Sequence, residues 1–241
     1  MTRMRPVAGM IALTGALVAS PALAAKKYQG GAVENGGVIR GNVVFKGTVP
    51  TVKVVIPEKD RAACGNDREG PALIVGPKKG VRDVIVYIKK INKGKPWAKP
   101  AKAAVLRNVK CRFEPHVQVM RKGKLTVVSE DPILHNTHGF YGKRTAFNMA
   151  LPKQGERIEA SLRRTGLARM ECDAHAWMRA YIYVARNPYW AITDDDGAFS
   201  LTDVPPGKYT LVATQGHVKT VEVPMTVKDG GETVMTIELK Q

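Results

Sequence analysis

One short loop of the sequence carries three side chains that are suited to binding a soft metal ion. Within residues 171–178, Cys172, His175 and Met178 follow one another at the spacing C-x2-H-x2-M. Thiolate and thioether sulfur favour Cu(I), imidazole suits copper, and a trigonal His2Cys set with a distant Met forms an electron-transfer copper site. The loop supplies three of these four groups, and the best candidate for the fourth is His135. These residue types predict a mononuclear copper site at His135, Cys172, His175 and Met178.

The surroundings of these residues favour a metal site over simpler interpretations. The loop lies between two strand-like runs, and His135 follows a third. The simpler alternative is that Cys172 and a hydrogen-bonded histidine belong to the protein core. A zinc site made of Cys172, His135 and His175 is also chemically feasible, but the thioether of Met178 favours copper.

Three motifs occur in order through the middle of the chain. They are F-E-P at 113–115, L-H-N-T-H at 134–138 and C-D-A-H-A-W-M-R at 172–179. In this combination residues 106–186 resemble a cupredoxin, and within that group they are most similar to amicyanin and plastocyanin. The resemblance implies an eight-stranded Greek-key β-sandwich with one type 1 copper, bound by the four residues above. Asp173 departs from the amicyanin pattern, and an acidic group beside the cysteine would lower the reduction potential or alter the axial bond.

The cupredoxin resemblance also implies how electrons enter and leave. In that pattern the loop histidine, here His175, reaches the surface through an apolar rim, and positive charges around the rim attract an acidic partner. Candidates for the rim are Pro132, Leu134, Phe140, Ala176 and Trp177, and candidates for the charges are Lys143, Arg144 and Arg179. The resemblance thus implies a redox partner protein, either a dehydrogenase or a cytochrome, that has an acidic surface.

Other residues near the expected site have expected roles of their own. Asn136 follows His135, and its amide is expected to bond to the backbone of the cysteine loop and so hold it; an ordinary turn residue is the alternative. His116 and His138, together with Met120, are candidates for a second, labile metal site, and polar surface positions are the alternative. His138 lies three residues after His135, so on a continued strand it faces the opposite side.

Residues 1–24 have the pattern of a secretory signal peptide. Two arginines precede an apolar run at residues 7–18, and A-L-A at 22–24 is typical of a cleavage site. The run is too short to span a membrane, and no later stretch is long and apolar enough. We expect a soluble protein that is exported, to a periplasm in a bacterium, with residues 25–36 as a disordered lead. A retained N-terminal anchor is the alternative.

Export permits disulfides, and the chain has three cysteines. If Cys172 holds a metal, Cys64 and Cys111 remain as a pair. Such a bridge would close a long loop and contribute about 2–4 kcal/mol of stability. The other two pairings would consume Cys172 and abolish the metal site.

The formal net charge of the chain is +17. This charge favours attraction to an acidic partner protein or an anionic membrane surface, and solubility alone is the simpler explanation. We expect no nucleic-acid partner, because the sequence has no helix-turn-helix, RNP-like or zinc-finger pattern. We also expect no enzyme, because no Ser-His-Asp pattern or pair of carboxylates stands out. A trinuclear copper oxidase would need many more histidines than the five present.

Short alternating strands with Gly and Pro turns between them predict an all-β chain. T-D-D-D-G-A-F at 193–199, followed by P-P-G-K-Y-T-L at 205–211, resembles the carboxypeptidase-regulatory, transthyretin-like β-sandwich. Residues 187–241 are too short for that module. We therefore expect residues 37–105 either to complete it, with the cupredoxin inserted between its strands, or to extend the cupredoxin sheet in tandem order.

These observations predict an exported cupredoxin that carries out one-electron transfer through a mononuclear type 1 copper site. The alternative is a periplasmic protein of copper delivery or resistance that handles Cu(I), and a third is a surface module whose metal is structural. An electron carrier keeps its copper in both oxidation states, whereas a delivery protein surrenders Cu(I) to a chelator.

Overall fold

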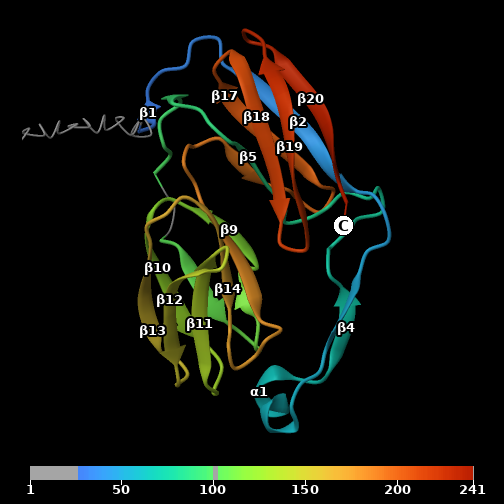
Figure 1. Cartoon of the computed structure of the whole chain (residues 1–241), viewed down its shortest axis with the longest axis vertical. Coiled ribbons are helices and arrows are strands. Elements are labelled where there is room, and N and C mark those ends of the chain that lie inside the picture. The colour runs from blue at the N-terminus through green and yellow to red at the C-terminus, as the bar shows by residue number, and fades with distance from the viewer. Residues whose placement is uncertain (1–26, 100–102, 241) are drawn as a thin grey trace, which may run out of the picture.

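The computed structural model describes residues 27–99 and 103–240, and among them the protein is almost entirely β-structure (Figure 1). The expected all-β class is therefore confirmed. The strands form two β-sandwiches, which lie one above the other in Figure 1. A long connecting segment that contains β4 and α1 runs beside the lower sandwich. The expected signal peptide at 1–24 lies outside the described residues. Within the described part, no helix has the length and apolar character needed to cross a membrane.

The upper sandwich, here called the terminal sandwich, combines strands from both ends of the chain (Figure 1). Its two sheets have the strand orders β16–β5–β18–β19 and β17–β2–β20. The bounds are β2 (Gly37–Phe45), β5 (Ile85–Ile88), β16 (Trp190–Ile192), β17 (Ala198–Val204), β18 (Gly207–Gln215), β19 (Val218–Val227) and β20 (Glu232–Leu239). β2 runs parallel to β20, and β5 pairs antiparallel with β16 and β18. Strands that precede and follow the middle of the chain thus share one sandwich.

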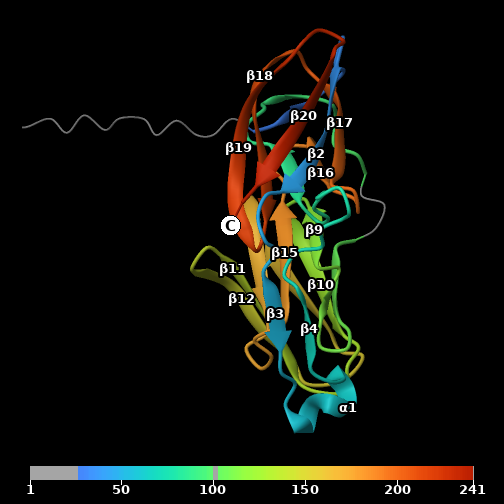
Figure 2. The ribbon, with the colours of Figure 1, turned by 90° about the vertical axis from the view of Figure 1, so that its right-hand side faces the viewer.

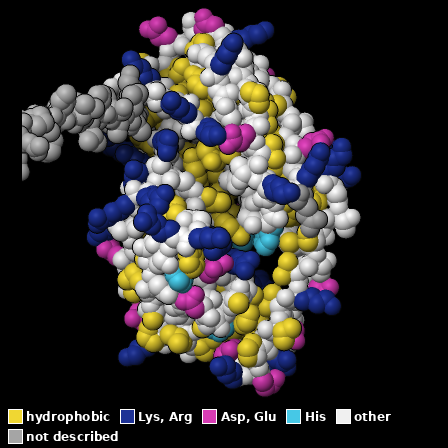
Figure 3. Space-filling model, viewed as in Figure 1, with side chains coloured by type: hydrophobic (Ala, Val, Ile, Leu, Met, Phe, Trp, Pro, Cys, Tyr) yellow, Lys and Arg dark blue, Asp and Glu magenta, His cyan; other side chains and the backbone are white. Residues whose placement is uncertain are grey.

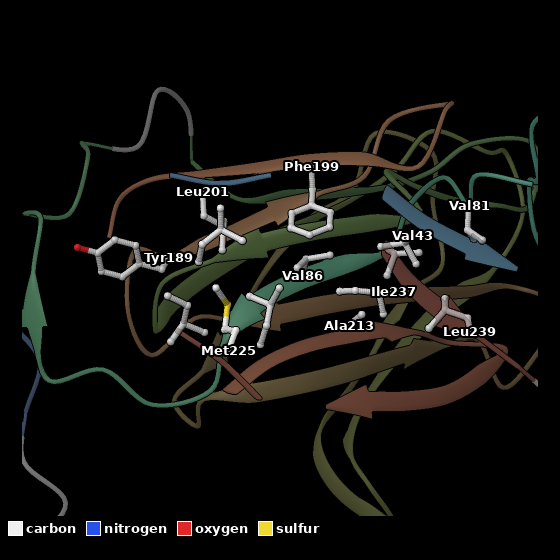
Figure 4. Packing of buried hydrophobic residues seen from close by; sticks show 14 of the residues in the cluster. Val43, Val81, Val86, Tyr189, Phe199, Leu201, Ala213, Met225, Ile237 and Leu239 are labelled. Carbon is white, nitrogen blue, oxygen red and sulfur yellow. The ribbon is translucent and has the colours of Figure 1, made fainter. Parts of the chain in front are cut away.

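Alternation of apolar and polar residues decides which faces of these strands meet. Along β2, Ile39 and Val43 are fully buried, whereas Asn42 between them in the alternation is exposed, because successive side chains of a strand point to opposite faces. Figure 4 shows side chains of both sheets meeting in the core, among them Val86, Ala213, Phe199, Leu201 and Ile237. The terminal sandwich therefore has a hydrophobic core of its own.

The lower sandwich, here called the central sandwich, spans residues 105–184. Its sheets have the strand orders β13–β10–β7–β8 and β12–β11–β14–β15–β9. The bounds are β7 (Val105–Asn108), β8 (Phe113–Glu114), β9 (Val117–Met120), β10 (Gly123–Ser129), β11 (His135–Tyr141), β12 (Arg144–Leu151), β13 (Arg157–Leu162), β14 (Gly166–Glu171) and β15 (Arg179–Val184). The described residues form nine strands here instead of the expected eight, because the chain passes from one sheet to the other between β8 and β9 and so contributes a short strand to each.

Strand β15 joins the central sandwich to the terminal one. Tyr87 of β5 stacks on Tyr183 of β15, with ring centroids 4.1 Å apart. The hydroxyl of Tyr181 donates to the carbonyl of Gly216 at 3.3 Å, and Gly216 lies so close to this ring that a Cβ there would overlap it. The face of β15 that carries Tyr181 and Tyr183 thus packs against the terminal sandwich.

The excursion beside the central sandwich is called the flap here and comprises residues 51–71. It contains β3 (Thr51–Val54), the 3-10 helix η1 (Glu58–Asp60), α1 (Arg61–Cys64) and β4 (Arg68–Pro71). β3 and β4 pair antiparallel, and Figure 2 shows them running along the central sandwich, with α1 at the far end. Ile56 and Cys64 are buried in the core of the central sandwich, and a disulfide joins Cys64 to Cys111. The segment 37–105 is therefore divided between the two sandwiches.

The disulfide leaves Cys172 as the free thiol of the chain. Thiol titration of the unfolded, metal-free and unreduced protein is expected to give one equivalent per chain. The same sample after reduction should give three, which serves as the control. Three equivalents before reduction would show that the Cys64–Cys111 bridge does not form.

The structure corrects the expectation of a disordered lead at residues 25–36 for those residues that it describes. β1 (Gln29–Gly30) pairs in parallel with β6 (Lys93–Gly94). The hydroxyl of Tyr28 donates to the carbonyl of Lys95 at 2.6 Å, and its ring meets Trp97 edge-on. The composition of the lead is polar and Gly-rich, and it does not reveal these contacts with a distant segment.

Candidate metal centre

The pairing of β11 with β14 brings the expected metal ligands together. The two strands are antiparallel, with His138 opposite Glu171, so the beginning of β11 lies next to the end of β14. His135 is the first residue of β11, and Cys172 directly follows β14. His175 and Met178 lie in the short loop that leads from Cys172 to β15.

Three ligand atoms face one another at this end of the central sandwich. The Nδ1 atoms of His135 and His175 are 3.0 Å apart, and the Sγ atom of Cys172 lies 3.8 Å from the first and 3.7 Å from the second. A point equidistant from all three atoms lies about 2 Å from each, which is a metal–ligand bond length. The side chains of His135, Cys172 and His175 are buried. Two nitrogens and a sulfur therefore fit a trigonally bound metal ion.

Met178 closes the loop that carries the other ligands. Its N–H donates to the carbonyl of His175 at 2.9 Å. Its side chain is buried in the same hydrophobic core as Cys172. The thioether thus belongs to the apolar surroundings of the site, where a weak axial ligand is expected.

A carboxylate that the sequence analysis did not single out holds His135. The Oδ2 atom of Asp131 lies 2.9 Å from Nε2 of His135 and is buried with it. Asp131 also accepts the backbone N–H groups of Lys110 and Cys111, at 2.6 and 2.8 Å. Metal-binding histidines usually donate their other ring N–H to such a group, which fixes the ring. The signal in the sequence was a carboxylate four residues before the histidine.

Asn136 holds the cysteine loop through its side-chain amide. Its Oδ1 accepts the backbone N–H of Asp173 at 2.7 Å and lies 3.4 Å from Sγ of Cys172. Its Nδ2 donates to Asp173 and to Asn148, at 2.7 and 2.8 Å. The asparagine therefore ties the strand that carries His135 to the loop that carries Cys172.

The structure does not bring the residues of the expected second metal site together. His138 of β11 contacts Asp173 through Nδ1 and Thr145 through Nε2, at 3.1 and 2.9 Å. His116 precedes β9, and its Nδ1 lies 3.0 Å from the carbonyl of Arg179. Strands β14 and β15 lie between β11 and β9, so about 14 Å of sheet separates the two histidines. Met120 is buried in the core. The expectation of a shared site is wrong because strand order was not visible in the spacing.

Burial and neighbouring charge set the protonation of the three ligands. Burial lowers the pKa of His135, but contacts with Asp131 and Cys172 outweigh it and raise that pKa to about 9. Burial raises the pKa of Cys172, but the His135 ring and backbone hydrogen bonds bring that pKa below its ordinary value. Burial and the charge of His135 lower the pKa of His175. The thiolate of Cys172, which is the form that binds metals, is thus more favoured than that of an ordinary cysteine.

The expectation that His175 reaches the surface is wrong. Its side chain is only 4% exposed, because the flap lies over it and brings Asp60 Oδ2 to 3.6 Å from its Nε2. Among the expected rim residues, Leu134 is exposed, and Trp177 is half-buried, with its Nε1 donating to the carbonyl of Cys111 at 3.1 Å. The ring of His175 is therefore covered in part by the flap, a segment far from the metal loop in sequence.

Comparison with known protein families concerns the C-terminal part of the chain. Residues 178–240 match the family model of the carboxypeptidase regulatory-like domain. This match confirms the resemblance expected for that part, and it begins upstream of residue 187, so that it includes β15. No curated protein matches the chain.

Cupredoxins are among the solved structures to which the chain is similar, as the sequence motifs predict. A purple cupredoxin from Nitrosopumilus maritimus is 15% identical, with 34% of this chain and 99% of that one covered and a TM-score of 0.29. Amicyanin from Paracoccus versutus is 18% identical, with 42% and 97% covered and a TM-score of 0.31.

A copper-containing nitrite reductase from Thermus scotoductus SA-01 is 22% identical, with 39% of this chain and 26% of that one covered and a TM-score of 0.31. The chain thus matches about a quarter of the length of that enzyme. Because all these TM-scores are low, the kind of metal is inferred from the ligand atoms themselves.

Proposed function

We propose that this protein binds one copper ion at His135, Cys172 and His175, with Met178 as a weak axial ligand, and carries single electrons between partner proteins. The observation that carries the proposal is the triangle of two Nδ1 atoms and one Sγ atom around a point about 2 Å from each. This donor set suits copper, because it combines a thiolate with two imidazoles, and the thioether of Met178 in the same loop is buried in the same core as Cys172.

A copper ion bound there would supply the one-electron redox couple. The chain supplies a rigid set of ligands, because Asp131 fixes the ring of His135 and Asn136 ties the cysteine loop to β11. Side chains locked by packing and by outer hydrogen bonds hold a site in one geometry. Ligands that do not move between the two oxidation states lower the reorganisation that electron transfer requires.

Burial of the site supports electron transfer over copper delivery. The residues His135, Cys172 and His175 are 0%, 1% and 3% exposed. A protein that hands Cu(I) to an acceptor must let the acceptor's ligands reach the ion. Here the flap and the loop enclose all three ligands, so the ion would be retained while electrons pass.

We further propose that the protein is exported, as the signal pattern of residues 1–24 suggests, and that it acts as a carrier and not as an enzyme. A disulfide such as Cys64–Cys111 persists mainly in oxidising compartments. Lys and Arg side chains are spread over both sandwiches on the face shown in Figure 3, with fewer acidic ones. Together with the net charge of +17, this supports a partner with an acidic surface.

Repeated redox cycling in the presence of a Cu(I) chelator tests the proposed function. The copper-loaded protein is expected to take up and release one electron per copper over several cycles, with its copper content unchanged. The chelator without protein and the metal-free protein are the controls. Transfer of most of the copper to the chelator on the first reduction would contradict electron transfer and support delivery.

A further inference from the structure

Each ring of the candidate site faces a carboxylate through Nε2, although only one of the two carboxylates lies near the site in sequence. The contact is a hydrogen bond for His135 and a longer polar contact for His175. His135 has Nδ1 toward the ligand triangle and Nε2 toward the carboxylate of Asp131. His175 also has Nδ1 toward the triangle, and its Nε2 lies 3.6 Å from Oδ2 of Asp60. Each imidazole therefore stands between the ligand triangle and a carboxylate.

Asp60 is held in this place by anchors on both sides of it. On one side, Ile56 is buried in the central core, and its N–H donates to Oδ1 of Asp67 at 2.8 Å. On the other side, Cys64 is buried and bonded to Cys111. The side chain of Asp60 is itself only 14% exposed. A carboxylate that is largely shielded from water and fixed on both sides is suited to orient the ring that it faces.

Cys111, the other half of the disulfide, is linked to His135 through Asp131. The backbone N–H of Cys111 donates to Asp131, which holds His135. The carbonyl of Cys111 accepts Nε1–H of Trp177, a neighbour of His175 in the loop. The disulfide thus ties the flap to the residues that position both histidines.

We propose that Asp60 is a positioning residue for His175, a role that rests on the proposed metal site. Its carboxylate orients the imidazole through Nε2, places a negative charge beside the centre and, with the flap, keeps water from the ring. The charge stabilises the more positive copper state and so lowers the reduction potential.

Hydrogen exchange at the two rings tests this role with a control inside the same molecule. In the Cu(I)-loaded protein, NMR can follow exchange with water of the Nε2 protons of His135 and His175. Asp60→Asn and Asp60→Ala are expected to speed exchange at His175 and to leave His135, which Asp131 holds, unchanged. Glu58→Gln is the matched control, because Glu58 belongs to the same short helix and is 86% exposed; it should change neither proton.

The reduction potential supplies a second result that a merely structural role would not produce. Both Asp60 variants are expected to raise the potential, by about 59 mV for each tenfold change in the relative affinity for the two copper states. Copper affinity should fall about 10- to 100-fold, as when other outer partners of metal-bound histidines are lost. Asp60→Asn keeps the size of the side chain, so it remains informative if Asp60→Ala does not fold.

Two outcomes separate this inference from the proposed function. Normal copper binding with unchanged exchange and potential in a folded Asp60→Asn protein would overturn the role of Asp60 alone. Failure of the unaltered protein to bind copper would overturn the proposed function. Exchange at His175 in the metal-free protein would then still decide whether Asp60 holds the ring: faster exchange in the variant supports it, and equal exchange refutes it.

Discussion

Replacement of Cys172 by serine is expected to abolish the visible colour of the copper-loaded protein. The sulfur lies in a triangle of ligand atoms, and when it binds Cu(II) as the thiolate, charge transfer from sulfur to copper would produce the colour. A serine hydroxyl is a harder and less acidic donor, so copper affinity should also fall by more than about 100-fold, the upper range for loss of an outer partner. Absorption spectra and copper titrations of the two proteins measure both effects.

Met178→Leu is the matched comparison, because it removes a sulfur from the same loop. A long axial bond contributes little affinity but tunes the potential. The variant should therefore keep its copper and its colour, and its potential should rise because an apolar side chain donates less electron density to Cu(II). Loss of copper as severe as in Cys172→Ser would show that Met178 is a strong ligand, and delivery of Cu(I) would become the better explanation.

Removal of the disulfide is expected to lower the free energy of unfolding of the metal-free protein by about 4 kcal/mol, the chain-entropy value for a loop of this length. The bridge joins residues 47 positions apart and connects the flap to the central sandwich. Urea unfolding of a Cys64→Ala, Cys111→Ala double variant measures the change. Metal-free samples are required, because a ligand that binds the folded state adds its own stabilisation.

The control for this prediction is the unaltered protein under reducing conditions, which breaks the bridge without removing any atoms of the core. Both samples should lose similar stability. Because Cys64 anchors Asp60 beside His175, copper should also exchange faster in the double variant. A loss below about 1 kcal/mol, less than the usual 2–5 for a native disulfide, would mean that the flap stays in place without its covalent link.

The core of the candidate site could be predicted from sequence because most of it is local. Cys172, His175 and Met178 lie on one loop, so their spacing alone indicates a ligand set. His135 could be added because a strand precedes it and a partner imidazole was needed. Which nitrogen of each ring faces the metal, and how deeply the rings are buried, depends on packing that the spacing does not contain.

Residues that contact the ligands but come from other parts of the chain could not be predicted from local spacing. Asp60 is brought to His175 by a flap whose sequence shows only a short alternating strand. His116 and His138 were expected together because the cupredoxin pattern places His116 on a neighbouring strand, but the sheet places β14 and β15 between β11 and β9. Long-range strand order is set by the whole core and not by any local pattern.

The same distinction applies to the fold as a whole. Alternating residues identify β2 and β20 as strands, but their parallel pairing joins residues near opposite ends of the chain. The turn motifs before β17 and β18 were sufficient to indicate the C-terminal family. The sequence left two arrangements open for residues 37–105. Its local patterns did not reveal that β2 and β5 pair with strands of the terminal sandwich, whereas the flap packs on the central one.

The visible and electron paramagnetic resonance spectra of the Cu(II)-loaded protein test the central claim most directly. The protein should bind one copper ion per chain and show a strong thiolate-to-copper absorption band, with a resonance signal from a single type of Cu(II). The Cys172→Ser variant, loaded in the same way, is the blank. A protein that binds copper without such a band, or that binds it equally well without the Cys172 thiolate, would contradict a centre built on His135, Cys172 and His175.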